Sequence, residues 1–150
     1  VVELLPSDYL QHIWKRVMPM LASDRDLEVR CAVIRRAEAE GMTALSGILV
    51  RMITADSFHK RELLEKDLAL TTFARMAGVQ AVDTLTKMLN ARVGLASPRQ
   101  GETRRLAAMA LASTGTIEAR RALAKAAKAW EPGQRKAAQE ALKAFEGAGS

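Results

Sequence analysis

Apolar residues recur every three or four positions along most of this 150-residue chain. This spacing places them on one face of an α-helix, so it predicts a chain of amphipathic helices. Three glycines, Gly41, Gly78 and Gly115, each end one such pattern and precede the next, and successive glycines lie 37 residues apart. Glycine is the residue best able to adopt the left-handed conformation that ends a helix. A fixed interval of this size is typical of a helical repeat array.

The same pattern gives approximate bounds for each helix. Ser97, Pro98 and Gln100 together form a helix start, with a capping serine, a first-position proline and a glutamine at the capping-box position. The longest connections cover residues 55–60 and 91–97, and Trp130–Gly133 is predicted to be a tight turn. Eight helices in four antiparallel pairs are expected, at about residues 8–17, 26–40, 42–54, 61–77, 79–90, 98–113, 117–129 and 134–145.

The second helices of the four pairs align without gaps when they are started at Arg30, Asp67, Arg104 and Arg135. One face of the aligned helices is mostly small or apolar, which predicts that it is buried. The predicted buried positions are Ala32, Val33, Ala37, Ala69, Leu70, Phe73, Leu106, Ala107, Leu111, Ala137, Ala138 and Leu142. The positions predicted to face outward are Cys31, Arg35, Glu38, Leu68, Thr72, Arg75, Arg105, Met109, Ala112, Lys136, Glu140 and Lys143.

Two segments carry a resemblance to a known family. Residues 26–33, DLEVRCAV, are similar to the turn-and-helix signature of HEAT repeats, and residues 115–123, GTIEARRAL, resemble the start of a unit in the short, lyase-type HEAT family. Asp67 stands where that pattern has arginine, and Glu131 stands where it has aspartate before proline. The resemblance spans roughly residues 8–146. It implies an all-α, right-handed α-solenoid of about four antiparallel helix pairs in one domain, with units near 8–41, 42–78, 79–115 and 116–146.

Composition narrows the class of protein and the cellular compartment that we expect. Apolar residues make up 49% of it, which is enough for a packed core. Cys31 is the single cysteine, so no internal disulfide can form, which suits a reducing compartment. No apolar run reaches the ~18 residues of a membrane span. We expect a piece of a longer, cytoplasmic and bacterial protein.

Candidate chemistry is sparse. His59 and Glu62 are spaced as a helical pair that could hold a metal, but no second such pair occurs, and His12 stands alone. Cys31 has no histidine near it in sequence and is expected to be inert. We therefore expect no catalytic residue, no metal and no cofactor. The resemblance leaves open an enzyme of the HEAT-like DNA glycosylase or lyase type as a third alternative.

The net charge of +6 is concentrated in the second half of the chain, where residues 101–150 carry 9 basic and 5 acidic groups. A positive field favours acidic partners, including nucleic acid. Glutamates accompany most of the basic doublets, however, and no aromatic residues that could stack on bases lie among them. A protein partner, with an acidic surface, is the first hypothesis, and a nucleic-acid backbone bound by the C-terminal half is the alternative.

Two surfaces could bind such a partner. In HEAT arrays the second helices line the concave face, so the resemblance implies a second-helix strip there. The two long connections form a loop rim, where binding residues of repeat arrays often collect. The first helix could also contact a second copy or an upstream domain through Tyr9, Ile13, Trp14 and Val17. The second-helix strip comprises Arg35, Glu38, Thr72, Arg75, Arg105, Met109, Lys136, Glu140 and Lys143, and the loop rim comprises Phe58, His59, Lys60, Arg61, Arg92, Val93 and Leu95.

Overall fold

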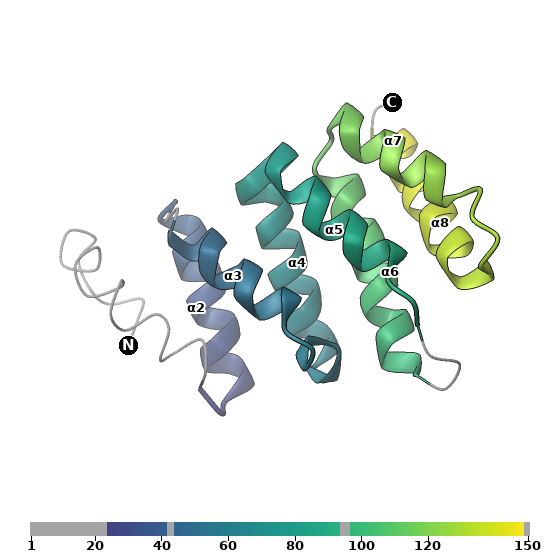
Figure 1. Cartoon of the computed structure of the whole chain (residues 1–150). Helices are drawn as coiled ribbons and strands as arrows, with labels where there is room; N and C mark the ends of the chain where they lie inside the picture. Colours follow the sequence, from purple (N-terminus) through teal and green to yellow (C-terminus); the bar gives the residue numbers. More distant parts are fainter. Residues whose placement is uncertain (1–23, 42–43, 94–96, 149–150) are drawn as a thin grey trace.

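A computed structural model describes residues 24–41, 44–93 and 97–148 of the chain, and all of its regular structure there is helical (Figure 1). The predicted helix at 8–17 lies outside these residues. The elements are α2 (Leu27–Ala39), α3 (Ala44–Thr54), η2 (Phe58–Lys60), α4 (Leu63–Ala77), η3 (Gly78–Gln80), α5 (Ala81–Asn90), α6 (Pro98–Ser113), α7 (Ile117–Ala126) and α8 (Pro132–Ala148). The all-α prediction is confirmed for this part of the chain.

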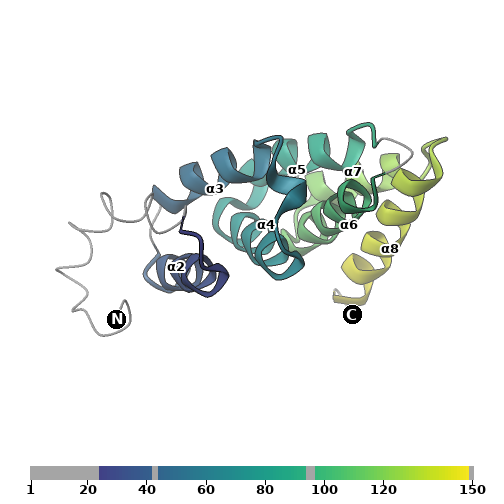
Figure 2. The same ribbon diagram turned by 90° about the horizontal axis from the view of Figure 1, so that it is seen from below.

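The helices form two layers. Helices α2, α4, α6 and α8 lie side by side in one layer, and α3, α5 and α7 pack across them in the other (Figure 2). Helix α4 contacts α2 on one side and α6 on the other, and α6 in turn contacts α8. The second helices of neighbouring pairs therefore pack against each other, and their equivalent residues lie 31 to 37 positions apart in the sequence.

Glycines end the helices of the first layer as the sequence predicted. Gly41, Gly78 and Gly115 have φ values of +62°, +53° and +66°, and every other described residue with a side chain has a negative φ. A Cβ at these three positions would be strained, because L-residues rarely adopt this conformation. The three glycines lie together at one edge of the two layers, and the C-terminal ends of α3, α5 and α7 lie at the opposite edge (Figure 1).

Side chains cap the helix starts that follow several connections. The Asp26 carboxylate accepts a hydrogen bond from the Glu28 backbone N–H at 2.8 Å, and the Ser97 hydroxyl accepts one from the Gln100 N–H at 3.3 Å. The Thr116 hydroxyl caps α7 in the same way. Each such cap typically stabilises a helix by about 1 kcal/mol. The predicted start at Ser97 and Pro98 is thus confirmed, whereas α8 begins two residues earlier than predicted, at Pro132.

The core lies between the two layers and consists largely of alanine and leucine. Nine of the twelve predicted core residues are buried. Leu106 and Leu142 are partly buried against the core, and Ala32 is also only partly buried. Small side chains let neighbouring helices approach closely, while leucines fill the space between layers. The fully buried members from the covering layer are Leu49, Ala81, Leu85, Leu89, Ala119 and Leu123.

Candidate binding surface

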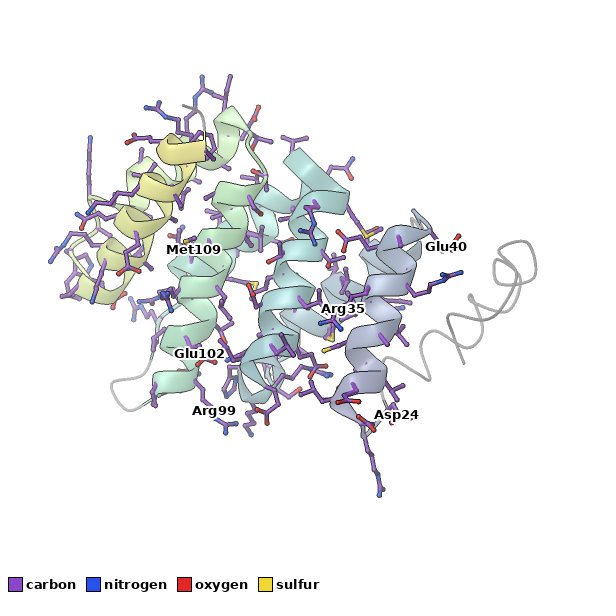
Figure 3. All side chains as sticks on the ribbon, turned by 180° about the vertical axis from the view of Figure 1, so that it is seen from behind. Asp24, Arg35, Glu40, Arg99, Glu102 and Met109 are labelled. Carbon is purple, nitrogen blue, oxygen red and sulfur yellow. The ribbon has the colours of Figure 1, made fainter. Side chains whose placement is uncertain are left out.

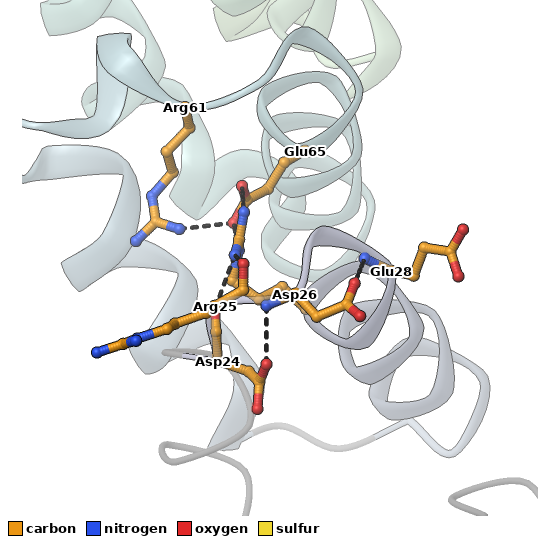
Figure 4. A network of polar contacts seen from close by, with 7 residues as sticks. Asp24, Arg25, Asp26, Glu28, Arg61 and Glu65 are labelled. Atoms are coloured by element: carbon orange, nitrogen blue, oxygen red, sulfur yellow. Dashed lines mark hydrogen bonds and ion pairs between the residues drawn. The ribbon is translucent and has the colours of Figure 1, made fainter.

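A series of buried and partly buried cations connects each helix of the first layer to the next. Arg30 on α2 donates two hydrogen bonds to the Glu65 carboxylate on α4, at 2.8 and 2.9 Å. Glu65 is fully buried and also accepts a hydrogen bond from Arg61 at 2.6 Å (Figure 4). A carboxylate at this depth is stable as an ion only when such partners surround it. The pair therefore fixes the position of α2 against α4.

The series continues along the layer. Lys66 on α4 is fully buried, and its amine lies 2.5 Å from Glu102 and 3.2 Å from the Thr103 hydroxyl, both on α6. Arg104 on α6, which is 4% exposed, pairs with Glu131 next to α8. We call Arg30–Glu65, Lys66–Glu102 and Arg104–Glu131 the cation ladder.

The same cations hold the backbone of the connections. Arg30 donates to the Asp24 and Arg25 carbonyls at 2.7 and 2.9 Å, and Lys66 donates to the His59 carbonyl at 3.2 Å. When the second helices are aligned with one another, Asp67 stands at the position that arginine holds in the other three. In the structure Lys66, one residue earlier, makes the equivalent contacts. Arg104 donates to the Ala91 carbonyl, and Arg135 donates to the carbonyls of Ala129 and Trp130.

The second-helix strip follows the outer face of the first layer. Figure 3 shows Arg35 on α2 and Met109 on α6 on this face, which is turned away from α3, α5 and α7. Two ion pairs cross it between neighbouring helices: Glu38 with Arg75 at 2.7 Å, and Arg105 with Glu140 at 3.5 Å. The strip thus contains both signs of charge. Its exposed members are Arg35, Arg75, Arg105, Met109, Lys136, Glu140 and Lys143, and Glu38 is partly exposed.

Two residues predicted to face outward on this layer are buried. Thr72 is fully buried and its hydroxyl lies 3.3 Å from the Glu38 carboxylate, so its assignment to an exposed strip is wrong. Cys31 is 2% exposed, and burial raises the pKa of its thiol, an effect that Glu65 reinforces and Arg35 and Arg30 oppose. The cause in both cases is the neighbouring helix, because α4 packs over the side of α2 that helical periodicity alone leaves open.

The loop rim is only partly exposed. Phe58 is 2% exposed and belongs to the core, so it is not a rim contact as predicted. Arg61 is held by Glu65, while Lys60 and Arg92 are exposed and His59 and Val93 are partly so. Leu95 lies outside the described residues. A pocket of about 320 Å³ is lined by residues of both long connections. Its lining includes Asp56, Phe58, His59, Arg92, Val93 and Arg104.

A larger pocket, of about 820 Å³, opens between the first turns of α6 and α8. It brings residues of both predicted surfaces together, because Val93 of the loop rim and Arg105, Lys136 and Glu140 of the second-helix strip all line it. The rest of its lining is Ser97, Pro98, Gly101, Arg104, Glu131, Gly133 and Ala137. Its lining does not include the other strip residues, which are Arg35 and Glu38 on α2, Thr72 and Arg75 on α4, Met109 on α6 and Lys143 on α8.

Some features of this surface were not predicted from the sequence. The acids that pair with the buried or partly buried cations, Glu65 and Glu131, were not assigned a role. Glu65 and Glu102 lie one 37-residue interval apart, which was a usable signal. Trp130 at the α7–α8 turn is 88% exposed, and Ile117 is 66% exposed. Helical periodicity does not report on single apolar residues at turns.

Within the described ranges, no three His, Cys, Asp or Glu side chains are grouped as they would be around a metal ion. No helix in those ranges has the length and apolar character needed to cross a membrane. Comparison with known proteins gives no match to a family model, to a curated protein or to a solved structure.

Proposed function

We propose that this chain is a non-catalytic protein-interaction module that binds its partner across the α6–α8 pocket and the adjoining second-helix strip. The observation that carries the proposal is that one 820 Å³ pocket is lined by residues of both surfaces predicted from sequence. Its walls combine exposed cations and carboxylates with apolar side chains. Protein interfaces favour such mixed surfaces, in which polar groups surround apolar contacts.

We further propose that the two layers belong to a right-handed α-solenoid of the HEAT type, as the sequence resemblance implies. The 37-residue glycine interval supports this, since each glycine ends a helix of the same layer. The arginines that bond the preceding connection also support it, because they recur at Arg30, Arg104 and Arg135. In such an array the second-helix strip is the natural place for an extended partner.

A nucleic-acid partner is the runner-up. It is favoured by the exposed face of α7, which carries Arg120, Arg121 and Lys125. The α6–α8 pocket, in contrast, contains Glu131 and Glu140, which would repel a phosphate backbone. The strip is also crossed by the Glu38–Arg75 and Arg105–Glu140 pairs, which reduce its positive field. A protein partner therefore fits this site better.

The test is affinity capture from source cells, followed by reconstitution with the captured protein in purified form. The pocket variant is Arg105→Glu with Lys136→Glu, and the matched control carries the same charge reversals at Lys125 on α7 and at Lys128 just after it, both exposed. Capture that is lost in the pocket variant and kept in the control supports the proposal. Capture that survives both reversals excludes this surface. Binding of duplex DNA at ~50 mM salt that only the α7 control loses would favour the runner-up.

A further inference from the structure

We infer that the partner is anchored through an acidic segment, one carboxylate of which binds between Arg105 and Lys136 in the α6–α8 pocket. This inference rests on the proposed function and names the chemistry of the partner at that site. It also assigns a role to Glu140: its carboxylate occupies the place near Arg105 that the incoming carboxylate would take.

The two ion pairs of the pocket differ in how easily they can be exchanged. Arg104 is 4% exposed and is also held by the Ala91 carbonyl, so its pair with Glu131 belongs to the fold. The Arg105 and Glu140 side chains are 63% and 44% exposed, and their closest atoms are 3.5 Å apart. A pair this open contributes little to stability. Arg105 can therefore change partners without disturbing the helices.

Lys136 supplies a second cation at the same wall. It is exposed and lines the pocket, and within the described part of the chain its amine makes no hydrogen bond or ion pair. Arg105 and Lys136 are thus two exposed positive groups on facing helices. Glu140 is the exposed carboxylate beside them, whereas Glu131, whose side chain is 35% exposed, is paired with Arg104. One added carboxylate would balance the charge of this wall.

The charge pattern favours an acidic peptide over a phosphate backbone. A nucleic acid presents one negative charge at each nucleotide, and Glu131 and Glu140 would meet several of them. A peptide instead alternates carboxylates with backbone N–H groups. The Glu140 carboxylate can accept hydrogen bonds from these N–H groups once Arg105 is released. The pocket lining includes no aromatic side chain on which a base could stack.

A glycine in the pocket lining offers a way to block the pocket without unfolding the chain. Gly101 lies within α6 and lines the pocket, and a Cβ built there would meet no atom within 4 Å. A larger residue at this position would therefore enter open space. Gly47 within α3 is equally unobstructed and is not part of the pocket lining. Gly101→Leu and Gly47→Leu form a matched pair.

The experiment is an NMR titration of the ¹⁵N-labelled chain with a synthetic peptide of about twelve residues that repeats Glu-Ala-Gly, alongside a neutral counterpart that repeats Gln-Ala-Gly. We expect saturable shifts of the Gly101, Gly133 and Ala137 amides with the acidic peptide only. Gly101→Leu should abolish these shifts and Gly47→Leu should keep them. Glu140→Gln should tighten binding roughly two- to fivefold, since it removes the competing carboxylate.

Equal shifts with the neutral peptide, no shifts at the pocket, or weaker binding by Glu140→Gln would each overturn the inference. Duplex DNA that shifts the same amides more strongly than the peptide would overturn it in favour of a phosphate ligand. The proposed function is judged separately by affinity capture. A protein whose capture depends on Arg105 and Lys136 would sustain that function even if the acidic peptide failed to bind.

Discussion

The first prediction concerns Glu65, the fully buried carboxylate at the start of the cation ladder. Replacing it by glutamine keeps the shape of the side chain but removes its charge. Three charge-assisted hydrogen bonds from Arg30 and Arg61 converge on it at 2.6 to 2.9 Å. Two of these bonds end on Oε1 and one ends on Oε2, so a glutamine with its carbonyl oxygen at the Oε1 position keeps two and loses one. Both arginines then face a neutral group.

The expected loss of stability follows from the burial of each partner. Hydrogen bonds to charged groups contribute about 1.5–3 kcal/mol each, and breaking a fully buried ion pair costs about 3–5 kcal/mol. The side chains of Arg30 and Arg61 are 15% and 29% exposed, so water can replace part of what is lost. We therefore expect Glu65→Gln to reduce the free energy of unfolding by about 2–4 kcal/mol.

Urea unfolding followed by circular dichroism measures this change, and a double-mutant cycle with Arg30→Met isolates the pair. The cycle is needed because Arg30 also bonds the Asp24 and Arg25 carbonyls, which contribute to the single-mutant value. We expect a coupling free energy of about 1–3 kcal/mol between the two positions. Glu62, an exposed carboxylate three residues earlier, is the control, and Glu62→Gln should leave unfolding close to wild type.

A coupling free energy near zero would refute this account of the ladder. It would mean that Arg30 and Glu65 are solvated independently in the folded protein. A loss of stability by Glu62→Gln as large as that by Glu65→Gln would point instead to a general charge effect in the connection.

Three further results are expected. Phe58→Ala should lower the free energy of unfolding by about 3–5 kcal/mol in urea, because its ring is 2% exposed in the core; a loss below about 1 kcal/mol would contradict that placement. Gly78→Ala should destabilise by about 1–3 kcal/mol because of its φ of +53°, whereas Gly47→Ala should stabilise α3 by up to about 1 kcal/mol; thermal unfolding that gives both the same sign would contradict this. Burial raises the pKa of Cys31, so the unfolded thiol ionises first; stability should fall as the pH rises above about 8.5, and Cys31→Ala should flatten that slope.

Much of the architecture could be predicted from the sequence because it depends on local signals. Gly41, Gly78 and Gly115 were expected to end helices, and all three have positive φ. Ser97 and Pro98 start a helix as predicted. These residues act through the backbone of their own segment, so a pattern of a few positions is enough to identify them.

The candidate site was harder to predict because its residues depend on neighbours about 30 residues away. Thr72 and Phe58 were expected at the surface, yet the packing of other elements buries them. Asp67 stands at the position that arginine holds in the other aligned helices, but its neighbour Lys66 makes the arginine-like contacts, because the Lys66 amine reaches Glu102 on α6. Helical periodicity distinguishes the buried face of a helix from its exposed face. It does not show which polar side chain forms an ion pair with the neighbouring helix.

The interval between Glu65 and Glu102 bears on how the chain could change in length. The two carboxylates lie 37 residues apart, which is also the distance between Gly41 and Gly78 and between Glu38 and Arg75. A natural or engineered deletion of residues 60–96 would therefore bring Glu102 to the position opposite Arg30 that Glu65 now holds. Loss of a whole unit would keep a carboxylate for the first arginine, whereas deletions of other lengths would leave that guanidinium without one.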